Sequence, residues 1–457
     1  MMPRACPIAI DTSGSDGAYT RDMNTPIKLP GVEERLEKRY NTLVQEHSGH
    51  AHPVAAGPRH LPDSDAKAAT QAAWRFFKNP RTKTTLLAQP LLNEARRAAA
   101  ADCADFALVM GDWSHLDYST HSDKPDRIQI GNKDEIGYEL FSQLLVSDRD
   151  GQPLAPLCLR LQAAAGMYSS QHNAPGPVAS QLDALTADLD YVSRLGLAKR
   201  PVFIFDAEVD SVYHYRLWCP DHLLLVRVDE ERKVLFEEQE RALPEVVEVL
   251  RQRQAFARVR QVKHKGEKVW QHVAEAAVTL HREACLNREV KGKRKRITVG
   301  GEPLQMRLVV SELRREDGTV VARWLLLSNV SAEVDAATLA LWYYWRWEIE
   351  SYFKLLKGAG QYLEQWQQET GERVLKRLLV ASMACVLVWR LARDKSAQGA
   401  RARRLLVALS GRQMEYGKEF TEAALLAGLW VLLAMLDTLE LHDPDQLREV
   451  ARSIFSG

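Results

Sequence analysis

The stretch LWYYWRWEIESYFKLLKG, residues 341 to 358, carries a charged and an apolar pattern at helical spacing. At about 100° per residue, Tyr343, Arg346, Glu350 and Lys357 fall within about 60° of one another on a predicted helix. Their stripe lies at the margin of the apolar face that would dock the helix on a core. One reading is an amphipathic helix with i, i+4 ion pairs; the other is a functional site along a helix.

The apolar face of the same helix is centred about 90° from the charged stripe. It consists of Trp342, Trp345, Ile349, Phe353 and Leu356. Glu348 falls outside both stripes, so we expect it to be solvated.

The order Tyr343, Arg346, Glu350, Lys357, with two, three and six residues between them, resembles the YREK signature of the insertion-sequence-four family of DDE transposases. The chain looks nearest to the Tn-five cut-and-paste type, over about residues 65 to 365. The resemblance implies a DNA transposase and calls for two further carboxylates on earlier strands.

Composition limits the other possibilities. Lys plus Arg is 61 and Asp plus Glu is 60, a formal charge of +1, so any DNA affinity must come from local patches. The six cysteines are scattered singly, which is typical of reduced thiols, and the longest apolar runs fall short of the roughly 18 residues of a membrane span. We therefore expect no membrane partner and a cytoplasmic protein; the resemblance implies a bacterial source and association with the nucleoid when the protein is bound to DNA.

Two apolar runs each close on an aspartate. FALVMGDWSHLDY (106 to 118) is a predicted strand ending in Asp112, and PVFIFDAEVD (201 to 210) one ending in Asp206. Between them, 138 to 148 and 156 to 164 are predicted to continue an antiparallel meander, and a helix over 180 to 198 to cross over. The second strand is then parallel to the first, so both aspartates emerge at one sheet edge.

The motifs around these aspartates add to the resemblance. WSHLDY resembles the family's DTTSLSY-like stretch and DAEVD its DREAD-like motif, although Ala207 stands where that pattern has Arg. Any contact of that arginine must be made otherwise or is absent.

The predicted fold class is α/β: an RNase H-like mixed sheet with helices on both faces, a β-rich insertion before the last catalytic helix, and helical terminal domains. The domains are predicted at 1 to 27 (disordered leader), 28 to 105 (helical DNA-end-binding), 106 to 370 (catalytic, insertion at about 230 to 320) and 371 to 457 (helical, dimerisation). Within 28 to 105, AAWRFFKNPR (72 to 81) resembles the region that grips transposon ends.

The insertion holds the densest charge block of the chain, NREVKGKRKRITVGG (287 to 301), predicted to contact the DNA backbone. The cations assigned to DNA there are Lys293, Arg294, Lys295 and Arg296. RWLLLSNV (323 to 330) then returns to the core, and by resemblance Trp324 at its start holds a flipped base.

Magnesium-dependent phosphodiester cleavage follows as the expected chemistry. Asp112, Asp206 and Glu350 are the predicted catalytic and metal-binding residues for two Mg²⁺ ions, with Mn²⁺ substituting. Arg346 and Lys357 would hold phosphates, and Tyr343 would bond to one near the scissile bond. The resemblance implies nicking, a hairpin, joining to target DNA, and a synaptic homodimer on the terminal inverted repeats.

Two other functions use the same residues. One is an RNase H-like endonuclease without strand transfer. The other is a transposase-derived DNA-binding regulator that no longer cuts, although all three carboxylates are present.

Overall fold

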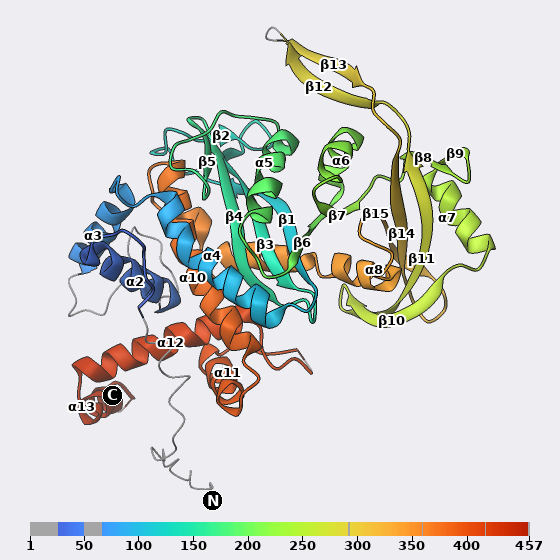
Figure 1. The fold of residues 1–457 in the computed structure, drawn as a ribbon. Helices are drawn as coiled ribbons and strands as arrows, with labels where there is room; N and C mark the ends of the chain where they lie inside the picture. Colours follow the sequence, from blue (N-terminus) through green and yellow to red (C-terminus); the bar gives the residue numbers. More distant parts are fainter. Residues whose placement is uncertain (1–25, 50–65, 291–292, 359, 416, 456–457) are drawn as a thin grey trace, which may run out of the picture.

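The protein, described by a computed structural model over residues 26–49, 66–290, 293–358, 360–415 and 417–455, is a mixed α/β structure (Figure 1). In the described residues one 13-stranded sheet forms its centre. Its earlier strands are β1 (Phe106–Asp117), β2 (Ile128–Gln129), β3 (Ile136–Ser147), β4 (Pro153–Ala163), β5 (Gly166–Ser169), β6 (Arg200–Phe205) and β7 (Leu223–Arg227). Its later strands are β8 (Lys233–Phe236), β9 (Gln239–Ala242), β10 (Ala257–His264), β11 (Glu267–Leu280), β14 (Leu304–Arg314) and β15 (Val320–Ser328).

The order of the strands along the sheet is β5-β4-β3-β1-β6-β7-β15-β14-β11-β8-β9. β1, β3 and β4 form the predicted antiparallel meander, and β6 is parallel to β1, as predicted. The crossover helix is α5 (Gln181–Ser193), which begins where the Ser180 hydroxyl accepts a hydrogen bond from the Asp183 N–H. β7 adds a third parallel strand beside β6.

Nearly every residue of β3 and β4 is buried, so both faces of these strands are covered. Two long helices, α4 (Thr84–Asp102) and α10 (Gly371–Arg393), pack against β4 and against each other. The apolar runs of the sequence therefore form the centre of the core, with helices from both ends of the chain over it.

β1 is longer than the sequence predicts, because the run expected to end at Asp112 continues to Asp117. Its parallel pairing with β6 stops at the pair Met110 and Ile204, whereas its antiparallel pairing with β3 continues to the end. β3 supplies hydrogen-bond partners after β6 has ended, and Asp112 thus lies inside a strand.

The insertion after β7 contains a helix that the sequence analysis missed, α7 (Leu243–Gln252). The signals were present: Pro244 at its start, and a Glu245 carboxylate that accepts the Ala242 N–H at 3.0 Å. Most strands of the insertion join the main sheet through β15. The exception is the hairpin of β12 (Ala284–Val290) and β13 (Lys293–Val299), which projects from the body (Figure 1).

The predicted single helix over 341 to 358 is wrong: it is divided into α8 (Ala336–Tyr344) and α9 (Trp347–Leu356). At the junction the Arg346 N–H bonds to Tyr343 O at 3.0 Å and the Glu348 N–H to Trp345 O at 2.9 Å. These bonds span three residues in place of four, which tightens the turn. The indole of Trp345 lies over Gly151, where an added Cβ would come within 2.6 Å of the ring, so a tertiary contact accompanies the break.

The helices near the two termini lie close together. α2 (Glu34–Gly49) and α3 (Ala66–Lys78) precede α4, while α11 (Ala397–Ser410), α12 (Glu422–Leu441) and α13 (Pro444–Phe455) follow α10. α12 contacts α2, α10 and α11; by length and composition alone it could also cross a membrane. α11 begins after Ser396, whose hydroxyl accepts a hydrogen bond from the Gly399 N–H. Nearly all of the predicted leader lies outside the described residues.

The remaining described elements are short. They are the 3₁₀ turns η1 (Ala207–Val209) and η2 (Leu363–Gln365) and the helix α6 (Val212–Trp218).

Candidate active site

Asp112 and Asp206 stand at the same edge of the parallel strands. Each lies two residues beyond the last paired residues of β1 and β6, Met110 and Ile204. Gly111 allows the two strands to meet here, because a Cβ at this position would lie 2.1 Å from the Phe205 ring. The sequence prediction that both aspartates share a sheet edge agrees with this register.

Arg346 connects the sheet edge to α9. Its Nη1 donates to Asp112 Oδ2 at 2.9 Å, and its Nη2 lies 3.7 Å from Glu350 Oε1. The Asp112 side chain is 9% exposed and that of Glu350 34%. The guanidinium therefore lies between a buried carboxylate and a half-buried one.

The pKa of Asp112 is influenced by the charges of the two other predicted carboxylates, Asp206 and Glu350. Burial raises the pKa of Asp112 to about 7; Arg346 opposes this shift, whereas the charges of Asp206 and Glu350 add to it. The pKa of Arg346 is raised by Asp112, Tyr343 and Asp206, against the effect of burial. Arg346 therefore partly neutralises the negative charge that gathers at this edge of the sheet.

The residue types suit a divalent cation bound through oxygen, since carboxylates are the ligands that Mg²⁺ and Mn²⁺ take in proteins. The Ser142 hydroxyl, opposite Asp112 on β3, is also buried with no hydrogen-bond partner. Yet in the described part of the chain no three His, Cys, Asp or Glu side chains form a ready-made metal site. The carboxylates are of the right kind, but here they stand around the guanidinium of Arg346.

Lys357 ends α9 and reaches back to β1. Its Nζ donates to His115 O and pairs with Glu364 Oε1 at 3.3 Å. Beside it, a cavity of 340 Å³ opens between Trp113 of β1 and Glu350 of α9. Glu350 and Lys357 thus line one cavity.

Tyr343 lies on the other side of the helix break. It is 5% exposed, and its ring lies edge-on to Trp324 with 5.6 Å between centroids. Trp324 is half-buried in the middle of β15, so the prediction that it starts a strand is wrong. Both aromatic rings pack with the core at the sheet edge.

Arg227, the last residue of β7, is a cation that was not predicted as a site residue. It is exposed, and its charge, after that of Arg346, opposes the rise in the pKa of Tyr343 that burial causes. β7 is parallel to β6, so Arg227 emerges at the edge that carries Asp206. The sequence contained a signal for this residue, because a cation follows the apolar residues of the third parallel strand. Arg227 adds a positive charge at the edge that carries Asp206.

The N-terminal helices form a cationic groove of 610 Å³. Arg75 and Arg81, from the segment predicted to grip transposon ends, line it, whereas the Lys78 Nζ lies over the Trp74 ring, 4.6 Å from its centroid. Across the groove stand cations of α2 that the sequence analysis did not name, namely Arg35, Lys38 and Arg39. Phe76 and Phe77 of the same segment are core residues.

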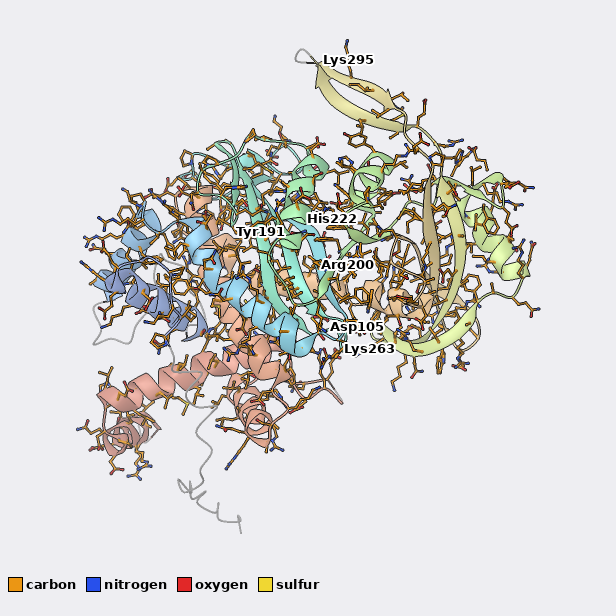
Figure 2. All side chains as sticks on the ribbon, in the orientation of Figure 1. Asp105, Tyr191, Arg200, His222, Lys263 and Lys295 are labelled. Atoms are coloured by element: carbon orange, nitrogen blue, oxygen red, sulfur yellow. The ribbon has the colours of Figure 1, made fainter. Side chains whose placement is uncertain are left out.

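The predicted charge block forms the projecting hairpin. Lys295 and Arg296 are exposed on β13, and Figure 2 shows Lys295 near its outer end. The side chains of Lys293 and Arg294 lie outside the described part of the structure.

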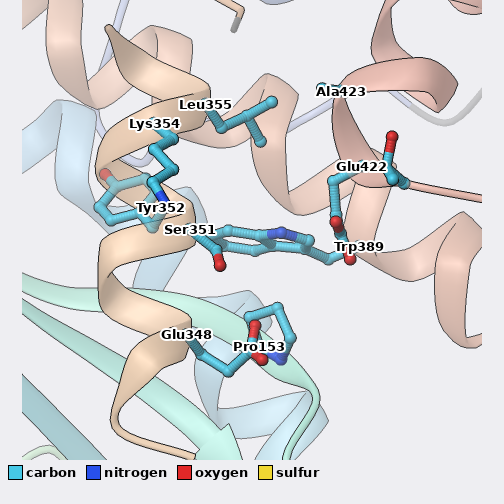
Figure 3. A pocket seen from close by; sticks show the side chains of 10 residues that line it. Pro153, Glu348, Ser351, Tyr352, Lys354, Leu355, Trp389, Glu422 and Ala423 are labelled. Atoms are coloured by element: carbon cyan, nitrogen blue, oxygen red, sulfur yellow. The ribbon is translucent and has the colours of Figure 1, made fainter. Parts of the chain in front are cut away.

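Glu348 was expected to be solvated, but it is not. It lines a cavity of 170 Å³ between α9 and the start of α12, and burial with the nearby Glu422 raises its pKa to about 7. Figure 3 shows Trp389 between these two glutamates.

No protein-family model matches the chain, and no curated protein matches it. Among solved structures, a cryo-EM structure of a piggyBac transposase synaptic complex with hairpin DNA aligns with 77% of this chain at 11% identity and a TM-score of 0.35. The chain spans 57% of that protein's length. A likeness at this level assigns neither fold nor function.

Proposed function

We propose that this protein is a DNA transposase that cuts at transposon ends by metal-dependent phosphodiester hydrolysis and transesterification, then joins the ends to target DNA. The observation that carries the proposal is the grouping of Asp112, Asp206 and Glu350 near Arg346, since Arg346 and Glu350 are also two of the four residues that resemble the YREK signature. The proposal also interprets the mixed sheet as an RNase H-like arrangement.

In this proposal Asp112 and Asp206 hold divalent cations from the sheet and Glu350 from α9. Two Mg²⁺ ions, or Mn²⁺ in their place, would activate water and stabilise the leaving 3′ oxygen. Arg346 would leave Asp112 to bind a phosphate with its planar fork. Lys357, Arg227 and Tyr343 surround the same edge and would orient the DNA backbone.

DNA would extend beyond this edge to two basic surfaces. The groove between α2 and α3 offers Arg35, Lys38 and Arg75 to phosphates of a transposon end. The projecting hairpin is a two-stranded ribbon, a shape that the major groove admits, with exposed Lys295 and Arg296. These surfaces account for DNA affinity in a chain of nearly zero net charge.

A synaptic homodimer is part of the proposal. α12 and α13 keep large apolar side chains exposed in the single chain, a pattern that marks interaction surfaces. They are Val431, Met435, Leu436, Leu439, Leu441, Val450 and Ile454. A second copy would cover this apolar surface and bring two ends together.

The test uses a supercoiled donor plasmid carrying the inverted repeats that flank the gene, an unmarked target plasmid, and Mg²⁺. The transposase proposal expects nicks at the repeat boundaries, hairpin ends and joined donor–target products, all absent with Asp206→Asn. Cleavage without joining would identify an endonuclease, and end binding without cleavage a regulator. Either result overturns the proposal.

A further inference from the structure

The turn after α9 brings Glu364 back to the side chain of Lys357. The Tyr362 N–H donates to Lys357 O at 2.8 Å, and Tyr362 takes a left-handed φ of 52°, which reverses the chain. Gly360 is required inside this turn, because a Cβ there would lie 2.1 Å from Leu355 O. The backbone conformation therefore decides where Glu364 stands.

Glu364 joins the end of α9 to the outer part of β1. Its Oε1 lies 3.3 Å from Lys357 Nζ and accepts the Asp117 N–H at 3.1 Å. Lys357 Nζ also donates to the carbonyl oxygen of His115 on the same strand. The strand that carries Asp112 and the helix that carries Glu350 are thus connected through one ion pair.

The turn has anchors that do not depend on this ion pair. The Tyr118 hydroxyl donates to Leu363 O, and the buried Trp366 donates its indole N–H to Gln361 O at 2.9 Å. The side chains of Lys357 and Glu364 are 27% and 35% exposed, and partly exposed pairs contribute little to stability. The fold should therefore tolerate loss of the Glu364 charge.

The ion pair between Glu364 and Lys357 restricts the direction in which the Lys357 ammonium group points. Lysine has a flexible four-carbon stem and three N–H donors. His115 O accepts one of these N–H groups and the Glu364 carboxylate attracts the ammonium group from 3.3 Å, so the two together hold it beside the cavity shared with Glu350. We infer that Glu364 is a positioning residue that aims Lys357 at a phosphate of the substrate DNA; this rests on the proposed function.

If Glu364 acted only through charge repulsion, its removal would have the opposite effect on DNA cutting. Removing a carboxylate beside a phosphate site lowers repulsion, so Glu364→Gln would bind and cut DNA at least as well. If Glu364 positions Lys357, the same substitution slows cutting, and the effect disappears once Lys357 is gone. A double-mutant cycle separates the two.

The experiment measures nicking of supercoiled plasmid DNA with Mn²⁺ by the full-length protein. It compares the wild type, Glu364→Gln, Lys357→Gln and the double variant. Glu369→Gln is the matched control, because Glu369 is a partly exposed glutamate paired with Arg373. Glu364→Gln is expected to nick about three to ten times more slowly, the range for loss of one ordinary intramolecular hydrogen bond. The double variant should match Lys357→Gln.

Glu364→Asp keeps the charge and should recover part of the rate, and melting curves check that each variant is folded. Full activity of Glu364→Gln, or losses that multiply in the double variant, would overturn the inference while leaving the proposed function standing. A wild type that does not nick at all counts against the proposed function itself, and so against this inference with it.

Discussion

Arg346 is hydrogen-bonded to Asp112, with 2.9 Å between Nη1 and Oδ2, inside the group of carboxylates proposed to bind metal. The same guanidinium lies 3.7 Å from Glu350. A positive group thus already occupies the position where a divalent cation would neutralise these acids. Metal and Arg346 should therefore compete for Asp112, and a DNA phosphate that attracts the arginine should favour the metal.

Substituting Arg346→Gln is expected to tighten Mn²⁺ binding by about tenfold in the absence of DNA, because a charged competitor for Asp112 is lost. Isothermal titration of the metal-free protein measures the affinity. Arg227→Gln is the control, since it removes a cation from the same edge that is not bonded to Asp112. Equal affinities for the wild type and Arg346→Gln would rule out competition.

Each of the substitutions Asp112→Asn, Asp206→Asn and Glu350→Gln is expected to reduce nicking to background while duplex binding persists. Each removes one charged oxygen ligand from the proposed metal site, whereas the basic surfaces are untouched. Plasmid nicking and fluorescence anisotropy measure the two properties. Asp105→Asn, an exposed aspartate at the opposite end of β1, should behave as wild type. Retained cleavage by Asp206→Asn would exclude it as a ligand.

Arg227→Gln should weaken duplex binding and lower the slope of log affinity against log salt by about 0.9, the value for one lost phosphate contact. Anisotropy titrations at several salt concentrations measure this slope. Arg200→Gln, at the other end of the parallel strands, is the matched control. An unchanged slope in Arg227→Gln would show that this arginine does not contact a phosphate.

Leu436→Glu or Leu439→Glu in α12 should prevent dimer formation, because a charge placed on an apolar contact surface is costly to bury. Both leucines are 48% exposed in the single chain, so the monomer should remain folded. Light scattering after size-exclusion chromatography, with and without end DNA, gives the mass. Leu405→Glu, an exposed leucine on α11, is the control. A monomeric wild type bound to two ends would disprove the dimer.

Glu46→Gln is expected to stabilise the protein at high pH only. Burial in α2 raises the pKa of Glu46 to about 8, although Arg39 and Arg377 oppose the shift. The folded protein therefore keeps a proton that the unfolded chain releases above its ordinary pKa of 4.5. That stabilising effect is complete below pH 4.5 and is lost as the pH rises through about 8.

Melting temperatures measured between pH 5 and 8 should show a growing advantage of Glu46→Gln, by about 2–4 °C at the upper end. Glu34→Gln, a substitution of an exposed glutamate in the first turn of α2, should show no such trend. A difference in melting temperature that stays constant across this pH range would show that the effect of Glu46→Gln does not come from titration of the Glu46 carboxyl.

The sequence by itself determined the centre of the fold. Its continuous apolar runs predicted β1, β3, β4 and β6, and strand order with a crossover helix placed Asp112 and Asp206 at one edge. These features depend on local patterns, hydrophobic runs and the handedness of crossovers, which a single sequence contains.

Only the tertiary structure decided how the edge is completed. The break between α8 and α9 occurs where Trp345 packs over Gly151, and the bond from Arg346 to Asp112 joins segments far apart in the chain. Arg227 likewise reaches this edge through strand register, and a reversed turn brings Glu364 to Lys357. Helical periodicity assumes an unbroken helix, and it contains no information about contacts made across the fold.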